Sequence, residues 1–284
     1  MSRLRELVAK ELAQPVDPSV AAIAAAIAAE HGESSRAVLF YGSCLREQQL
    51  DGLMLDFYLI VSDYRAAYSR RWMATANRLI PPNVFPFHHA DLAAKYAVLS
   101  EADFDRLNGP GTRNVSVWAR FAQPSRLVWV RNELAQAMAV DAVAKAVPTL
   151  LGAAGKRDGE DMLDWWRRAF ALTYSAELRA ERKGRSQSVV DIDPDRYRRF
   201  GDAAAGQIGA NADQWTRRRI EGKLLSVLRL AKASATYAGG ADYIAWKINR
   251  HAGTSFELKP WQKRHPLLAA ISLLPRLLKS GAIR

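Results

Sequence analysis

Residues 38–62 read VLFYGSCLREQQLDGLMLDFYLIVS, two apolar runs separated by a polar segment. Runs of this length and composition predict two neighbouring strands. The first ends in Gly42-Ser43, a turn whose backbone N–H groups and hydroxyl can approach a phosphate closely. The second carries Asp56 among large apolar neighbours, where an unpaired carboxylate is costly unless a metal ion or hydrogen-bond donors meet it. Together they predict a site for a nucleoside triphosphate with Mg²⁺, and the alternative is an ordinary capped turn beside an edge-strand acid.

The composition favours an anionic partner. The chain has 284 residues, of which 41 are Lys or Arg and 29 are Asp or Glu, so its formal net charge is +12. This charge suits a nucleotide, a nucleic acid or an acidic membrane and does not choose among them. Cys44 is the only cysteine, which excludes an internal disulfide and a cysteine zinc site. Because no run approaches about 20 apolar residues, we expect no segment that spans a bilayer.

Helix and strand signals alternate along the first half of the chain, and helical periodicity dominates from about residue 132. This order predicts an α/β + α fold: a nucleotidyltransferase-like domain with a small mixed β-sheet, followed by a mainly helical domain. The expected units are residues 1–131, 132–256 and a basic tail at 257–284. The strands after residue 62 are expected at 84–88, 95–99 and 127–130, and the helices of the first half at 1–12, 17–30, 65–80, 101–107 and 115–121.

Several short motifs follow one another along the chain: Phe40-Tyr41-Gly42-Ser43, Leu55–Asp63, Pro82-Asn83-Val84-Phe85, Lys95–Ser100, Ala119–Pro124, Leu172–Arg179 and Ala235–Gly240 with Lys247. In this order they resemble those of the mitochondrial-type phosphatidate cytidylyltransferases, the translocator assembly and maintenance family of CDP-diacylglycerol synthases. The resemblance covers roughly residues 36–252. The chain departs from the family pattern at Cys44, Gln123 and Ala176-Glu177.

The resemblance implies a reaction of CTP with phosphatidic acid that gives CDP-diacylglycerol and pyrophosphate and requires Mg²⁺. The attacking phosphate monoester is largely dianionic, so catalysis can rest on positioning and charge neutralisation without a strong general base. The site residues expected on this basis are Asp56 and Lys95 as catalytic groups, Tyr41, Gly42, Ser43, Asn83, Arg120 and Arg179 around the nucleotide, and Asp56, Asp63 and Glu177 as metal ligands.

For several of these residues, a structural explanation stands beside the functional role. Lys95 in a strand is unusual unless its ammonium group reaches an anion, although an edge-strand charge that blocks aggregation is equally consistent. Tyr58 stands where polymerase-like enzymes place a second acid, so that acid must come from elsewhere. Arg120 and Arg179 could clamp a phosphate or lie on the surface, and Asn83 could serve a hairpin turn.

The tail predicts membrane contact. No acid follows Glu257, while basic residues flank the apolar stretch 267–274, which is too short to span a bilayer but long enough to lie in its interface. We therefore expect a peripheral protein at the cytoplasmic face of a membrane and no nucleic-acid partner. A helix packed on the second domain is the alternative for the tail. Two other functions stay open: a nucleotidyltransferase acting on RNA or protein through the arginine-rich run 215–219, and a non-catalytic basic binding module.

Overall fold

A computed structural model describes residues 2–47, 54–90, 92–177, 189–209 and 214–236. Its centre is a mixed five-stranded sheet with strand order β3-β4-β2-β1-β5. β2 and β4 are parallel, and the remaining neighbouring pairs are antiparallel. The strands are β1 (Ser35–Tyr41), β2 (Leu55–Val61), β3 (Asn83–His89), β4 (Leu92–Ser100) and β5 (Ser125–Val130). The chain thus has the predicted mixed α/β class.

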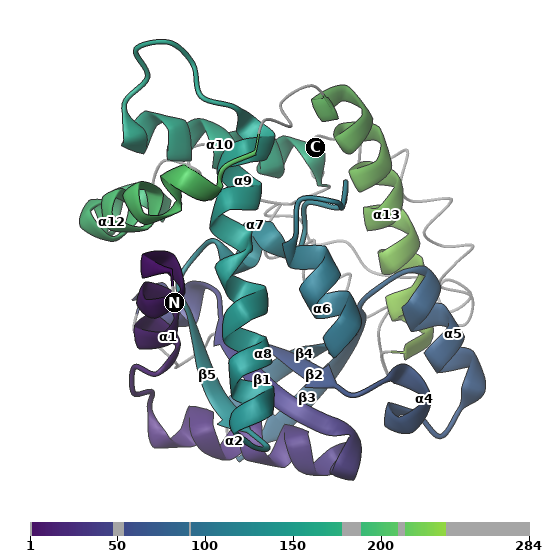
Figure 1. The fold of residues 1–284 in the computed structure, drawn as a ribbon. Coiled ribbons are helices and arrows are strands. Elements are labelled where there is room, and N and C mark those ends of the chain that lie inside the picture. Colours follow the sequence, from purple (N-terminus) through teal and green to yellow (C-terminus); the bar gives the residue numbers. More distant parts are fainter. Residues whose placement is uncertain (1, 48–53, 91, 178–188, 210–213, 237–284) are drawn as a thin grey trace, which may run out of the picture.

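Helices cover both faces of this sheet (Figure 1). α2, α4 and α5 cover one face, and the other face carries most of the remaining helices. The helices are α1 (Arg3–Leu12), α2 (Pro18–Glu30), α3 (Ser43–Glu47), α4 (Tyr64–Ala67), α5 (Arg71–Leu79), α6 (Glu101–Asn108), α7 (Trp118–Phe121), α8 (Glu133–Ala144), α9 (Ala146–Ala154), α10 (Met162–Ala176), α12 (Pro194–Ala204) and α13 (Trp215–Thr236), with short 3₁₀ turns at Gly32–Ser34 and Ala205–Gln207.

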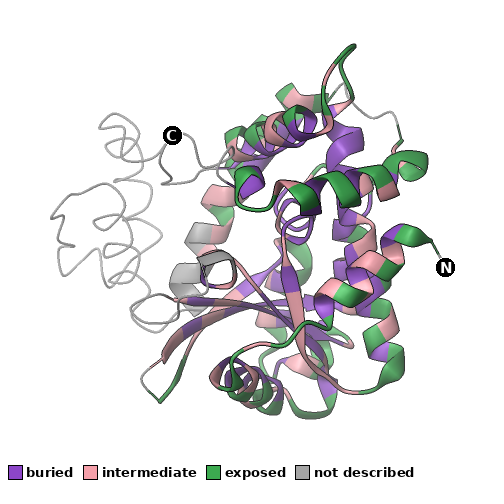
Figure 2. Ribbon diagram, turned by 90° about the vertical axis from the view of Figure 1, so that its left-hand side faces the viewer, coloured by how far each residue is buried: buried purple, intermediate pink, exposed green. Residues whose placement is uncertain are grey.

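The alternation of side chains along each strand divides the core into two clusters. On β2, Phe57 and Leu59 face α2, whereas Tyr58 and Ile60 face the opposite side of the sheet, which most of the remaining helices cover. Figure 2 shows the buried residues concentrated between the sheet and its helices. The larger cluster extends from the sheet into α8, α9, α10 and α12, so it crosses the position near residue 132 where we place the domain boundary. The two halves therefore share one hydrophobic core.

Two predictions about helices need correction. The helix predicted over 65–80 is two helices, because the chain turns at Tyr68 to bury that ring against His31 and Phe85. The expectation that no segment could span a bilayer was wrong by length and composition: α8 and α9 form a run, Glu133–Ala154, of 22 residues that meets both criteria. That run is 67% buried inside the protein, as expected of a core helix.

Candidate functional site

Strand register places the predicted acid and lysine side by side. Asp56 on β2 is opposite Lys95 on the parallel strand β4 and opposite Tyr41 on β1, so the three form one row across the sheet. Lys95 Nζ lies 2.8 Å from Asp56 Oδ1, and the side chains are 25% and 19% exposed. The charge that offsets the burial of Asp56 is thus supplied by Lys95, and both groups still reach solvent.

The Gly42 turn lies directly against this ion pair. Gly42 has a φ of 101°, a conformation that residues with a Cβ atom rarely adopt. A Cβ atom built on Gly42 would lie only 2.8 Å from Asp56 Oδ2. The glycine therefore serves both the turn and the close approach of the backbone to the carboxylate. Ser43 follows as the first residue of α3. The predicted neighbourhood of the Gly-Ser turn and Asp56 is confirmed.

Arg120 and Glu177 face this row from the helical side. Arg120 comes from α7, and Glu177 follows the last residue of α10. Arg120 Nη1 lies 3.6 Å from Glu177 Oε1, and the Glu177 side chain is only 7% exposed. Burial lowers the pKa of Arg120, but the opposing influence of Glu177, followed by those of neighbouring tyrosines and Asp56, raises it overall. Arg120 is therefore a permanent cation that pairs with Glu177 and also lies in the electrostatic field of Asp56.

Two tyrosines form the floor between these charges. Tyr41 and Tyr58 pack with ring centroids 5.3 Å apart, and Phe121 of α7 contacts both rings. Burial raises the pKa of Tyr41, and the Asp56 carboxylate raises it further. Burial likewise raises the pKa of Tyr58, although Arg120 opposes the change. Both hydroxyls thus stay protonated at neutral pH and can donate hydrogen bonds to an anion.

Helix α13 adds cations that the sequence had not singled out. Arg229 Nη1 donates to Ser116 Oγ at 2.9 Å, and its Nε donates to the carbonyl of Pro81 at 2.8 Å. Arg120 donates to the backbone carbonyl of the same Ser116. Ser116 therefore holds both guanidinium groups, one through its carbonyl and one through its hydroxyl. Lys232, one turn further along α13, donates to the carbonyls of Ile80 and Pro82.

The same electrostatic environment marks α13 as part of the cluster. Burial lowers the pKa of Arg229, while Glu177 and Tyr58 oppose that change. Burial, with a smaller contribution from Arg229, lowers the pKa of Lys232 to about 7. Signals for these residues were present in the sequence: Arg229 interrupts an apolar helical run, Val227-Leu228-Arg229-Leu230, as Lys95 interrupts an apolar strand.

The acids fit a magnesium ion only in part. Across the described ranges, no group of three His, Cys, Asp or Glu side chains could hold a metal ion. Asp56 and Glu177 both influence Arg120, and Asp56 has one oxygen, Oδ2, turned towards the Gly42 backbone. Mg²⁺ in nucleotide sites is commonly held by one or two carboxylates together with substrate phosphates. Such a shared site, rather than a preformed protein cage, is what these residues allow.

Two predicted site residues, Asn83 and Asp63, are not brought to this cluster. Asn83 pairs with Val98, whose side chain lies on the α2 face of the sheet, so Asn83 points away from Asp56. Its side-chain amide donates a hydrogen bond to the carbonyl of Met73 in α5. Asp63 lies beyond the opposite end of β2, about 20 Å along the strand, and caps α4 through Arg65 and Ala66. These placements do not fit nucleotide binding by Asn83 or metal binding by Asp63 together with Asp56. Arg179 lies outside the described residues.

The arginine-rich run expected to form a nucleic-acid face is engaged inside the protein only in part. Arg218 is buried and donates to the carbonyl of Thr112, and Trp215 donates to the carbonyl of Ala153. Arg217 pairs with Glu221 at 3.0 Å, and Arg219 donates to the Ser175 hydroxyl. Arg217 and Arg219 nevertheless lie at the surface, so the run 215–219 turns one arginine inward and leaves two exposed.

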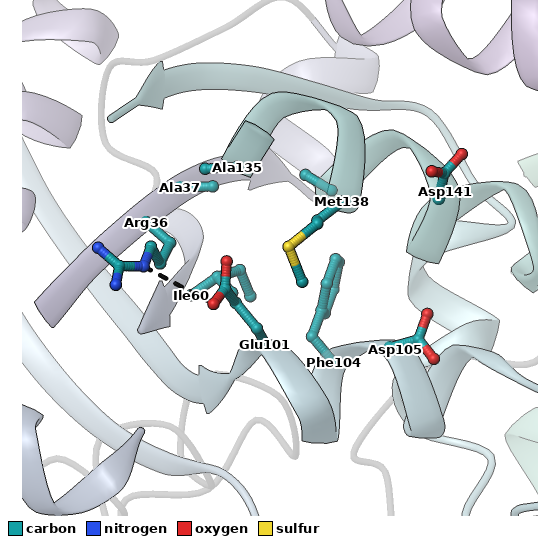
Figure 3. Close-up of a pocket in the computed structure, with 10 residues that line it drawn as sticks. Arg36, Ala37, Ile60, Glu101, Phe104, Asp105, Ala135, Met138 and Asp141 are labelled. Carbon is teal, nitrogen blue, oxygen red and sulfur yellow. Dashed lines mark ion pairs between the residues drawn. The ribbon is translucent and has the colours of Figure 1, made fainter. Parts of the chain in front are cut away.

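A separate pocket of about 210 Å³ lies between the start of β1, α6 and α8. Figure 3 shows Arg36 and Glu101 at one side of it, joined by an ion pair of 3.7 Å, and Phe104 and Met138 directed into it. Its strand residues, Ala37 and Ile60, belong to the end of β1 and β2 remote from Gly42 and Asp56. The pocket is therefore distinct from the charged cluster.

Neither a family model nor a curated protein matches this chain. The functional interpretation consequently rests on the residues and their geometry.

Proposed function

We propose that the protein is a nucleotidyltransferase that transfers the CMP group of CTP to phosphatidic acid, giving CDP-diacylglycerol and pyrophosphate with the help of Mg²⁺. The observation that carries the proposal is the contact of the Gly42 turn with the Asp56–Lys95 pair. A glycine backbone, a carboxylate and an ammonium group within one small surface are the components that bind a triphosphate. The choice of CTP and of phosphatidic acid rests on the family resemblance.

Each residue has a chemical role in this proposal. The acceptor phosphate oxygen forms a bond to the α-phosphorus of CTP, while the bond from that phosphorus to the bridging oxygen breaks and pyrophosphate leaves. Lys95 and Arg120 neutralise charge that builds on the phosphate oxygens. The turn at Gly42-Ser43 orients the triphosphate through backbone N–H groups and a hydroxyl. Mg²⁺, held by Asp56 with the phosphates and by Glu177, would neutralise further charge.

The acceptor is a lipid, so the protein should work at a membrane surface. We propose a peripheral location at the cytoplasmic face, with anionic headgroups attracted by the basic tail at 257–284. That tail lies outside the described residues, and the proposal for it rests on its sequence alone: basic residues on both sides of an apolar stretch.

A non-catalytic anion-binding module is the second candidate, and one observation favours it. Asp56 already has a cationic partner in Lys95, and no third metal-ligating side chain joins Asp56 and Glu177 among the residues described. A site of this composition could hold a nucleotide without catalysing its reaction. Transfer to RNA is less favoured, because Trp215 and Arg218 are turned inward.

A three-way incubation separates these functions. Purified protein is mixed with Mg²⁺ and either CTP or ATP, with and without vesicles that contain phosphatidic acid, and pyrophosphate is measured. Release from CTP that depends on the lipid supports the proposed reaction. Release that proceeds without lipid indicates another acceptor, and nucleotide binding without any release indicates the binding module.

A further inference from the structure

The guanidinium group of Arg229 is held firmly but is not fully used. Its Nε and Nη1 atoms donate to Pro81 and Ser116, as described above. Its Nη2 atom is buried and has no hydrogen-bond partner among the residues that the structure describes. Two fixed bonds from a planar group also fix the direction of its remaining N–H groups. Arg229 therefore presents a pre-oriented donor that no residue in the described part of the chain satisfies.

An unsatisfied donor of this kind destabilises the folded protein. An unsatisfied buried hydrogen-bonding group bears the full desolvation penalty of its burial, and the penalty is larger when the group is charged. The surroundings add positive charge to that penalty, because Arg120 lies near Arg229, and Glu177 is the acid that acts on both guanidinium groups. An anion placed beside Arg229 and Arg120 would satisfy the free N–H groups and balance the charge.

We propose that Arg229 binds a phosphate group of the substrates directly through Nη2, as a binding residue contributed by α13. Ser116 acts as the positioning residue, since it fixes Arg229 through its hydroxyl and Arg120 through its carbonyl. Lys232 contributes by joining α13 to residues 80–82, which hold the other side of Arg229. The phosphate site is thus incomplete until α13 packs beside α10 and β3.

The inference rests on the proposed function in taking a phosphate compound as the ligand. Two phosphates could fill the position: one of the triphosphate, or the monoester of the acceptor lipid. Both have phosphate oxygens that can accept parallel hydrogen bonds from the planar guanidinium group. Binding measurements on separate ligands tell them apart, because pyrophosphate and CTP report the first, and a short-chain soluble phosphatidic acid reports the second.

The test compares Arg229→Met and Arg229→Lys with a matched control, Lys223→Met, which removes one charge from an exposed position of the same helix. Calorimetric titration of the full chain with each ligand and Mg²⁺ gives the affinities. We expect Arg229→Met to weaken at least one of the phosphate ligands tenfold or more. Arg229→Lys should weaken the same ligand by a smaller factor, and Lys223→Met should match the wild type.

The thermal unfolding midpoint separates binding from a structural role. In the wild type and in Lys223→Met, the ligand should raise the midpoint, whereas in Arg229→Met the rise should be lost even though the unliganded protein still unfolds cooperatively. Should Arg229→Met fail to fold, Arg229→Lys decides: wild-type affinity for all three ligands overturns the proposal. Unchanged affinities in a folded Arg229→Met, or no binding of any ligand by the wild type, overturn it as well. Loss of binding in Arg229→Met together with no transfer of CMP to lipid would instead keep the phosphate site and reject the proposed reaction.

Discussion

Replacing Gly42 by alanine tests whether the turn and Asp56 act as one site. The new Cβ atom would lie 2.8 Å from Asp56 Oδ2, several tenths of an ångström closer than ordinary contact allows. The carboxylate would have to shift, although Lys95 holds its other oxygen. The backbone at a φ of 101° adds about 1–3 kcal/mol of strain for a residue with a side chain. We therefore expect a folded protein with a displaced carboxylate.

Two glycines provide matched controls for the backbone term. Gly32 and Gly159 also have positive φ values, 51° and 70°, but a Cβ atom on either would meet nothing within 4 Å. Alanine at these positions should cost about 1–2 kcal/mol of stability and leave the site untouched. A displacement of about 1 Å in a catalytic group can cost about 10²-fold in rate, so the loss of turnover should be specific to Gly42→Ala.

The assay combines urea denaturation with CTP titration and pyrophosphate release for all three variants. We expect all three variants to lose stability to a similar extent. Gly32→Ala and Gly159→Ala should keep the CTP affinity and turnover of the wild type, whereas Gly42→Ala should show at least tenfold weaker CTP binding or turnover. If Gly42→Ala binds and turns over CTP as well as Gly32→Ala does, the turn is structural and the proposed triphosphate site is refuted.

Three further predictions concern pH, base selectivity and the tail. The pKa of Lys232 is lowered from 10.5 to about 7 in the folded protein, so the unfolded state binds more protons between these values and stability should rise with pH there, by at most about 1.4 kcal/mol per pH unit. Urea denaturation from about pH 6.5 to about pH 9 should show a flatter dependence in Lys232→Met, and equal slopes would contradict the assignment. The Gly-Ser turn contacts phosphates rather than the base, so Ser43→Ala should weaken CTP, ATP and GTP alike while CTP remains the tightest ligand of the wild type; calorimetric affinities equal for all three nucleotides would argue against a cytidylyltransferase. Deletion of residues 260–284 should leave CTP binding intact and abolish sedimentation with phosphatidic acid vesicles, whereas unchanged sedimentation or an unfolded truncation would assign the tail to the core.

The sequence identified the central pair because each residue conflicts with its surroundings. Asp56 and Lys95 are charges inside apolar strands, and burial of a charge requires a partner. Their pairing depends on the parallel register of β2 with β4, which neither strand encodes by itself. Gly42 could be assigned to a turn, but its contact with Asp56 required the antiparallel register of β1.

The predictions for Asp63 and Asn83, and the omission of Arg229, have equally specific causes. The sequence alone could have excluded Asp63 as a metal ligand beside Asp56, because seven residue steps of extended strand place the two about 20 Å apart. Asn83 required knowledge of which face it shares, since a shift of one residue in register would reverse its direction. Arg229 was missed because its partners, Pro81 and Ser116, lie more than a hundred residues earlier in the chain.

The most direct test of the central claim follows the α-phosphate of CTP. Purified protein is incubated with CTP labelled at that phosphate, Mg²⁺ and phosphatidic acid vesicles, and the lipid fraction is extracted and counted for the wild type and for Asp56→Asn. We predict labelled CDP-diacylglycerol from the wild type and a loss of order 10²-fold or more in the variant. Label that stays out of the lipid with the wild type, or equal labelling by Asp56→Asn, would contradict the account.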